Sequence, residues 1–316
     1  MKWFKGICSA FAAHNRFNTK IAENKQSSEK LGWEPSWFGC KVFDQKLVES
    51  IKKFQLKYEI LTATGVVDTP TFRRKLTERE GLVVALKEYA ERNRRSPNAI
   101  VCNDKYVDIN WDKVVLFKEV DGFKLPPNCY RKSKDERKPN MFVAHWDVCL
   151  SSKSCFKILK KRGISVHFCI DNDGTIYQLM DCNDIGWHAG NRKVNNNSIG
   201  VEISDAYYPK YQELYKTKGF GERPVWSDAE VHGRKLKPFL GFYDVQIEAF
   251  KALAKALHDA YDIPLVAPMM GEELLKGVDP DVQKGTFQGV INHYHVTRRK
   301  IDCAGLKLDK ILKEIT

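Results

Sequence analysis

Six polar residues in the second half of the chain have the side-chain types that metal-dependent hydrolysis requires. They are His145, Glu202, His293, Lys300, Asp302 and Cys303. Hydrolysis at a single zinc ion needs three nitrogen, oxygen or sulfur ligands and one open position for water. It also needs a base that accepts the proton of this water, and a cation or donor that stabilises the developing oxyanion. Because all these types lie beside apolar, strand-like residues, the sequence predicts a hydrolytic site with one zinc ion per chain.

Apolar runs typical of buried strands lead into these residues. The run at residues 140–144 ends at His145, and residues 289–292 continue directly into His293. Further strands are expected at residues 106–109, 114–117, 164–170, 175–179 and 198–203, helices near 152–161 and 244–261, and an irregular insertion at 205–243. Strands that alternate with helices predict an α/β domain whose site lies at the strand ends.

The N-terminal part has a different pattern. Residues 14–30 are polar and are expected to be loose. Beyond them, Phe43, Leu47, Ile51 and Phe54 recur at helical spacing and predict an amphipathic helix. A second, shorter helix is predicted after the turn at residues 64–68, with Asp68 or Thr69 as its cap, Pro70 near its first turn and Leu76 at its end.

These patterns predict three regions. The first is a three-helix module at residues 28–80, which has the size of a small domain. A charged helix that ends at Ser96-Pro97 is expected to link it, over residues 81–98, to a catalytic domain at 99–316.

Charge and cysteine content narrow the choice of partner and compartment. A formal net charge of +12 favours an acidic partner: nucleic acid, an anionic membrane or an anionic cell-wall polymer. We find no signature of a module that reads RNA or DNA, and no run approaches the roughly 20 apolar residues of a membrane span. The nine cysteines form no CxxC pair and are odd in number, which predicts buried free thiols in a chain made in a reducing compartment.

The first 13 residues resemble a secretory signal only faintly. They contain lysines, an apolar stretch and Ala10-Phe11-Ala12 as a candidate cleavage site. Because the apolar stretch is short and lacks leucine, we expect a small amphipathic helix here, with no export signal.

Residues 43–76 resemble the peptidoglycan-binding module of many cell-wall hydrolases. The similarity rests on Phe54-Gln55 in the first helix, the turn Thr64-Gly65-Val66-Val67-Asp68, and Thr71 with Leu76 in the second helix. The alternative is a generic helical bundle whose apolar stripe is only its core. The resemblance implies that this region binds bacterial peptidoglycan.

Residues 140–305 resemble the zinc amidase family that includes N-acetylmuramoyl-L-alanine amidases, amidase-type phage lysozymes and peptidoglycan recognition proteins. Five motifs occur in the order of the family: Phe142-Val143-Ala144-His145-Trp146, residues 165–178, Gly186-Trp187-His188-Ala189-Gly190, residues 197–202, and the cluster around His293 and Lys300. The resemblance implies a mixed central sheet flanked by helices, a zinc ion, and cleavage of the amide between N-acetylmuramic acid and L-alanine.

The resemblance also implies a role for each matching residue. His145 and His293 correspond to zinc ligands, with His295 as a rival of His293 because it would point along the same strand face. The third ligand is Asp302 if the family's lysine is Lys300, which stands two residues before it. Counting directly from His293 instead selects Cys303, which leaves Ile301 in the place of the lysine. We favour Asp302, because a catalytic cation is harder to lose than one loop residue.

The remaining assignments concern catalysis and substrate binding. Glu202 matches the glutamate that one branch of the family uses as general base, and Val166 stands where the other branch has a tyrosine. Lys300 suits oxyanion stabilisation, and Trp187 and His188 match a motif that forms a wall of the substrate site. His167 is expected to be structural or to support the metal ligands.

The most specific hypothesis is a phage or prophage endolysin, made in the host bacterial cytoplasm and acting on the cell wall. The same reaction would also suit a bacterial autolysin or a recycling amidase. A non-catalytic peptidoglycan recognition protein is a third alternative, but the presence of Glu202, Lys300 and a full ligand set argues against it.

Overall fold

The computed structural model describes residues 2–58, 61–82 and 98–316, with side chains from Phe17 onward. The chain divides into two compact units, Met1–Arg79 and Glu80–Thr316. Most of the predicted linker helix at 81–98 lies outside the described residues. None of the helices in the described ranges is long and apolar enough to span a membrane.

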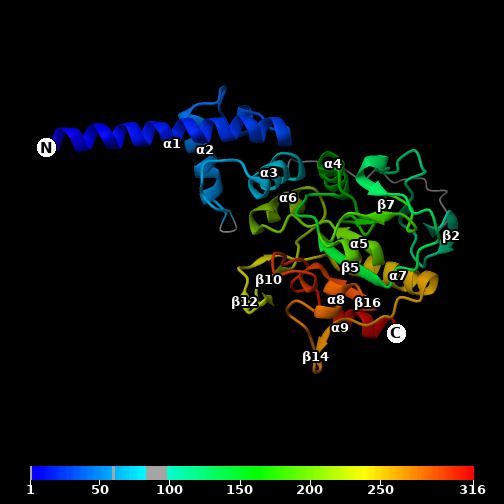
Figure 1. Ribbon diagram of the computed structural model, residues 1–316. Coiled ribbons are helices and arrows are strands. Elements are labelled where there is room, and N and C mark those ends of the chain that lie inside the picture. The colour runs from blue at the N-terminus through cyan, green and yellow to red at the C-terminus, as the bar shows by residue number, and fades with distance from the viewer. Residues whose placement is uncertain (1, 59–60, 83–97) are drawn as a thin grey trace. The chain divides into compact units, whose positions relative to one another are not determined.

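The first unit is built from helices α1 (Lys2–Leu31), α2 (Gln45–Leu56) and α3 (Thr69–Leu76) (Figure 1). The expectation that residues 14–30 are loose was wrong, because α1 runs through all of them. In the part of α1 whose side chains are described, the buried residue is the polar Asn24. The buried side chain of Asn24 donates to the Gly65 carbonyl at 2.9 Å and accepts from the Val67 amide at 3.0 Å.

The two predicted helices of this unit are confirmed. The Asp68 carboxylate accepts from the Thr71 amide and caps α3, as the sequence predicted. Gln55 in α2 is buried, and its side chain bonds the Gly65 amide at 2.8 Å and the Thr71 hydroxyl at 3.0 Å. A Cβ at Gly65 would lie 2.8 Å from the Val48 side chain, so only glycine fits this turn.

The second unit contains a six-stranded sheet in the order β16-β5-β9-β6-β7-β3 (Figure 1). The strands are β3 (Val114–Val115), β5 (Met141–Trp146), β6 (Phe168–Ile170), β7 (Ile176–Gln178), β9 (Ser198–Ile203) and β16 (Gly289–Asn292). All neighbouring pairs are parallel except β6 and β7, which form the expected hairpin. The prediction of a mixed sheet in an α/β fold is therefore confirmed, although β6 is shorter than predicted.

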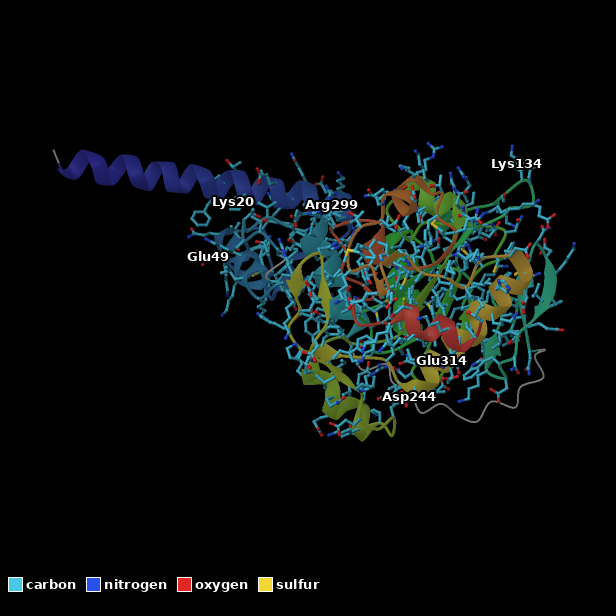
Figure 2. All side chains as sticks on the ribbon, turned by 90° about the horizontal axis from the view of Figure 1, so that it is seen from below. Lys20, Glu49, Lys134, Asp244, Arg299 and Glu314 are labelled. Carbon is cyan, nitrogen blue, oxygen red and sulfur yellow. The ribbon has the colours of Figure 1, made fainter. Side chains whose placement is uncertain are left out.

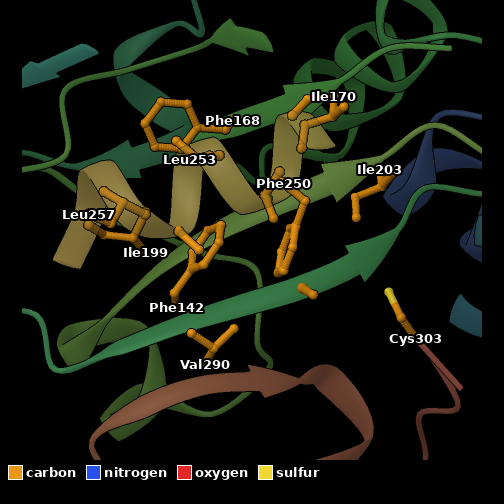
Figure 3. Close-up of a cluster of buried hydrophobic side chains, with 14 of the residues drawn as sticks. Phe142, Phe168, Ile170, Ile199, Ile203, Phe250, Leu253, Leu257, Val290 and Cys303 are labelled. Atoms are coloured by element: carbon orange, nitrogen blue, oxygen red, sulfur yellow. The ribbon is translucent and has the colours of Figure 1, made fainter. Parts of the chain in front are cut away.

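Helices cover both faces of this sheet. The apolar side of α7 (Asp244–Tyr261) packs on the face that carries Phe142, Phe168 and Ile199, as the close-up in Figure 3 shows. The opposite face carries Met141 and Val143 and is covered by α5 (Arg192–Asn197) and α8 (Pro280–Lys284), with α4 (Ser152–Arg162) against β6 and β9. Labelled charged side chains such as Lys134, Asp244 and Glu314 lie at the surface (Figure 2).

The stretch 205–243 is less irregular than predicted. It contains helix α6 (Gln212–Thr217) and the short strands β10 (Val225–Trp226), β11 (Glu230–Val231), β12 (Arg234–Lys235) and β13 (Phe239–Leu240). Arg223, fully buried within it, holds these pieces to the main sheet by donating to the carbonyl oxygens of Ser204 and Gly241. The segment therefore combines a buried cation and its acceptors with buried apolar side chains such as Phe239 and Leu240.

Candidate metal centre and catalytic site

Two imidazoles and one carboxylate meet beyond the C-terminal ends of β5 and β16. His145 is near the end of β5, and His293 opens the 3-10 turn η5 (His293–His295) that follows β16. The Nδ1 atoms of His145 and His293 lie 2.8 Å apart. Oδ2 of Asp302 lies 2.8 Å from Nδ1 of His293 and 3.2 Å from Nδ1 of His145. All three side chains are buried, and we call them the triad.

The donor types and spacing of the triad fit a zinc ion. Zinc in proteins binds histidine nitrogen and carboxylate oxygen at about 2.0–2.2 Å, so neighbouring ligand atoms of a tetrahedron lie roughly 3.4 Å apart. The three observed separations, 2.8, 2.8 and 3.2 Å, are slightly shorter than this edge. Three protein ligands leave the fourth tetrahedral position for water or substrate, as catalytic zinc sites do.

The structure brings Asp302, and not Cys303, to the two histidines. Cys303 is buried in the apolar cluster on the α7 face of the sheet (Figure 3). The same burial raises the pKa of its thiol well above the usual value, which disfavours the thiolate that metal binding requires. Of the two alternatives for the third ligand, only Asp302 has the required position.

The protonation states of the triad side chains also favour binding of a metal cation. Burial, together with the neighbouring His293, lowers the pKa of His145 to about 4. Burial opposes ionisation of Asp302, but nearby His293 and Lys300 hold its pKa well below the usual range. At neutral pH the triad therefore offers a neutral His145 and an ionised Asp302, the states in which these groups bind metals.

Glu202 lies beside the triad on the same face of the sheet. It is the residue of β9 that pairs with His145 of β5 in the parallel register, and directly paired residues point to the same side. Its Oε2 atom is buried without a hydrogen-bond partner. Burial, with the nearby acidic groups Cys155, Asp147 and Asp302, raises the pKa of Glu202 well above its usual value. A carboxyl group of this kind is suited to accept and return a proton.

The matched family agrees with this arrangement. The family model for N-acetylmuramoyl-L-alanine amidase matches residues 135–304, which is more than half of the chain and includes the triad and Glu202. The chain belongs to this amidase family. The family resemblance inferred from the sequence motifs is therefore confirmed, and the chain is an enzyme of this class.

Solved amidase structures are also similar to this chain. The N-acetylmuramoyl-L-alanine amidase LysC from Clostridium intestinale URNW is 19% identical, with a TM-score of 0.37. The match covers 65% of this chain and 98% of the LysC chain. A mutant endolysin from Bacillus subtilis is 16% identical, with a TM-score of 0.37, covering 64% and 98%. No curated protein sequence matches the chain. The family assignment rests on the family model, since these identities and TM-scores are low.

Lys300 lies at the edge of the amidase site. Its side chain is exposed, as is that of neighbouring Arg299 (Figure 2), and its backbone carbonyl accepts from Nε2 of His232 at 2.9 Å. The charge of Lys300 lowers the pKa values of His145, Glu202 and Asp302, so it is electrostatically coupled to the triad and to the carboxyl group beside it.

His295 does not share a strand face with His293. Residues 293–295 form a 3-10 turn, so the expected strand alternation was wrong at this position. Nδ1 of His295 accepts from the Asn292 amide, and Nε2 donates to the Leu275 carbonyl. Both nitrogens are occupied by backbone groups, and His295 holds the turn that presents His293.

The structure places the two predicted substrate-wall residues differently. The Trp187 side chain is exposed, which is compatible with the substrate contact that the sequence predicted. The His188 ring is turned toward the triad, with Nδ1 3.0 Å from Nε2 of His145. Sequence reasoning missed this contact, because the two residues lie far apart in the chain and in separate motifs.

Proposed function

We propose that this amidase hydrolyses the amide between N-acetylmuramic acid and L-alanine with one zinc ion held by His145, His293 and Asp302. The observation that supports the proposal is the convergence of these three ligand atoms beside Glu202, whose Oε2 atom is buried without a hydrogen-bond partner. Peptidoglycan is the partner that the family assignment supports.

The side chains have separate roles in this proposal. A zinc ion in the triad would supply a Lewis acid and would lower the pKa of water toward roughly 7. Glu202 accepts the proton of the attacking water and returns it to the leaving amine of L-alanine. The ammonium group of Lys300 stabilises the negative charge that develops on the carbonyl oxygen.

The reaction is tested by digesting purified peptidoglycan with the full-length protein and identifying the products by mass spectrometry. We expect new L-alanine amino termini, and loss of this product when a chelator is added and its return when zinc is restored. New reducing sugar ends would show a glycosidase instead and would contradict the proposal. Activity that survives thorough chelation would remove zinc from it.

As to biological setting, we propose a phage or prophage endolysin that is made in the host cytoplasm and acts on the cell wall. The eight described cysteines are free and buried, which supports synthesis in a reducing compartment. A bacterial autolysin or recycling amidase would carry out the same reaction. Expression in a host bacterium separates the settings: an endolysin should lyse cells only when the inner membrane is permeabilised.

We also propose that the first unit binds peptidoglycan. The resemblance of its Phe54-Gln55 helix and glycine turn to wall-binding modules supports this role, and the buried contacts of Gln55 explain why those motifs occur together. The full-length Glu202→Gln protein should co-sediment with insoluble peptidoglycan. The same protein without residues 1–79 should co-sediment less, and equal binding would assign the affinity to the catalytic unit.

A further inference from the structure

The segment Trp187-His188-Ala189-Gly190 contacts both histidines of the triad on their outer sides. Nε2 of His145 lies 3.0 Å from Nδ1 of His188. Nε2 of His293 lies 3.2 Å from the carbonyl oxygen of Ala189. Two adjacent residues therefore meet the two imidazoles, each at the nitrogen that points away from Asp302.

The contact with the Ala189 carbonyl determines which nitrogen of His293 carries the proton, and the contact with His188 allows the same arrangement in His145. A carbonyl oxygen only accepts, so Nε2 of His293 is the donor and its Nδ1 keeps a lone pair. His145 can present a lone pair at Nδ1 when Nε2 donates to Nδ1 of His188. Nε2 of His188 then carries a proton and donates to the Ser198 hydroxyl oxygen at 3.3 Å. In this series of hydrogen bonds, each N–H group points away from the triad.

The surroundings of His188 are shaped to hold its ring. A Cβ at Gly200 would lie 2.8 Å from Nδ1 of His188, so a side chain at position 200 would displace the ring. Oδ1 of Asn195 accepts from the amides of His188 and Ala189, at 3.2 and 2.8 Å, and fixes the backbone of the segment.

We propose that His188 and the Ala189 carbonyl position the metal ligands, by fixing His145 and His293 in the tautomer whose Nδ1 atom is free to bind zinc. His188 is thus a positioning residue that acts through His145, in place of the substrate-wall role predicted from the sequence. The inference rests on the proposed zinc site. Partners of this kind orient ligand imidazoles, and their loss typically weakens metal binding by about 10–100-fold.

The test compares zinc dissociation constants of full-length variants, measured by competition with a chromophoric chelator at one pH. His188→Leu removes the acceptor for His145 and should weaken zinc binding by about 10–100-fold. His188→Asn retains an acceptor oxygen close to the position of Nδ1 and should restore most of the affinity. Rescue by Asn is not expected if the ring only fills space.

His167 provides a matched control. Its ring is also buried on this face of the sheet, but Nδ1 accepts from the Gly200 amide and Nε2 donates to the Asp184 carbonyl. His167→Asn should lower the unfolding temperature and leave the zinc dissociation constant unchanged. A similar loss of zinc affinity in this variant would show that any disturbance of the buried residues near the triad has the same effect, and it would overturn the specific role of His188.

The outcomes separate this inference from the proposed function. If the wild-type protein binds no zinc, the proposed function fails and the inference fails with it. If the wild type binds one zinc ion and His188→Leu binds it equally well, only the positioning role is overturned. Should His188→Leu not fold, His188→Gln serves instead, because its longer side chain moves the amide oxygen away from the Nδ1 position; unchanged zinc affinity in that variant would equally overturn the inference.

Discussion

Two buried polar clusters in the second unit differ in the source of their cation. Around Arg223, acceptors surround a guanidinium group that the chain supplies. It donates to the carbonyl oxygens of Gly241 at 2.8 Å and Ser204 at 2.9 Å, to Oε1 of Gln246 at 3.2 Å, and to Oδ1 of Asn172. At the triad, two imidazole nitrogens and a carboxylate oxygen face one another instead.

This difference separates a structural cluster from a functional one. The acceptors around Arg223 are paired within the fold, so the cluster stabilises the segment 205–243 and has no need of a ligand. The triad brings lone pairs together, and such an arrangement is stable only when protons or an external cation lie between them. We therefore expect substitutions in the triad to change metal binding and activity, and substitutions at Arg223 to change the free energy of unfolding.

The largest effect is expected for His145→Ala. The variant loses one of three ligands, so zinc should no longer bind at stoichiometric concentrations and peptidoglycan hydrolysis should fall to background. Metal analysis of the purified protein and release of L-alanine amino termini measure the two effects. Zinc retained at one ion per chain in His145→Ala would place the metal elsewhere. The triad would then not be the functional cluster of the two.

Glu202→Gln should separate metal binding from catalysis. The amide has nearly the same shape but cannot accept a proton, so the hydrolysis rate should fall by about 10²–10⁴-fold. The zinc dissociation constant should change little, because Glu202 is not among the three converging ligands. A rate within a few-fold of the wild type would exclude Glu202 as the base.

Much of this fold could be predicted from the sequence because its strands and main helix are strongly periodic. The strand at residues 198–203 and the helix at 244–261 were predicted with the bounds that the structure shows. A helix was expected in the first 13 residues, but its continuation through residues 14–30 was missed, because its buried contact is the polar Asn24 and hydrophobic periodicity does not register it.

The candidate site was likewise predicted in part from the sequence. Family spacing named all three members of the triad, although it left Asp302 and Cys303 as alternatives. The spacing from Lys300 favoured Asp302 but left Cys303 open, because the outcome depends on how a loop folds after η5. It also could not show that His188 faces His145, since the two residues are 43 positions apart and belong to separate motifs.

Arg223→Met should show the opposite behaviour to the triad variants. Removal of the guanidinium takes the donor from the Gly241 carbonyl and from Oδ1 of Asn172, and leaves Asp205 without the nearby positive charge that lowers its pKa. We expect the free energy of unfolding to fall by about 3–5 kcal/mol. Urea unfolding of the zinc-free proteins measures this loss. The zinc dissociation constant of the folded variant should match the wild type, and a large change would show that the clusters are coupled.

The smallest effect concerns the pH dependence of stability, to which the buried His167 contributes. Burial, with a further contribution from Arg137, lowers the pKa of His167 to about 3 from a usual value of 6.5. Between these values the unfolded chain binds a proton that the folded chain does not bind. Stability is therefore fully present above pH 6.5 and is lost progressively as the pH falls toward 3.

Other buried groups titrate in the same range, so the useful quantity is a difference between two proteins. Burial raises the pKa of Asp205 to about 7, which makes stability fall as the pH rises and so opposes the effect of His167. His167→Asn removes one titrating group and leaves Asp205 in place. Between pH 6 and pH 5 the unfolding free energy of the wild type should therefore fall by about 1.2 kcal/mol more than that of the variant. Parallel pH profiles of the two proteins would mean that His167 is protonated in the folded state, and it would then be an unsuitable structural control for His188.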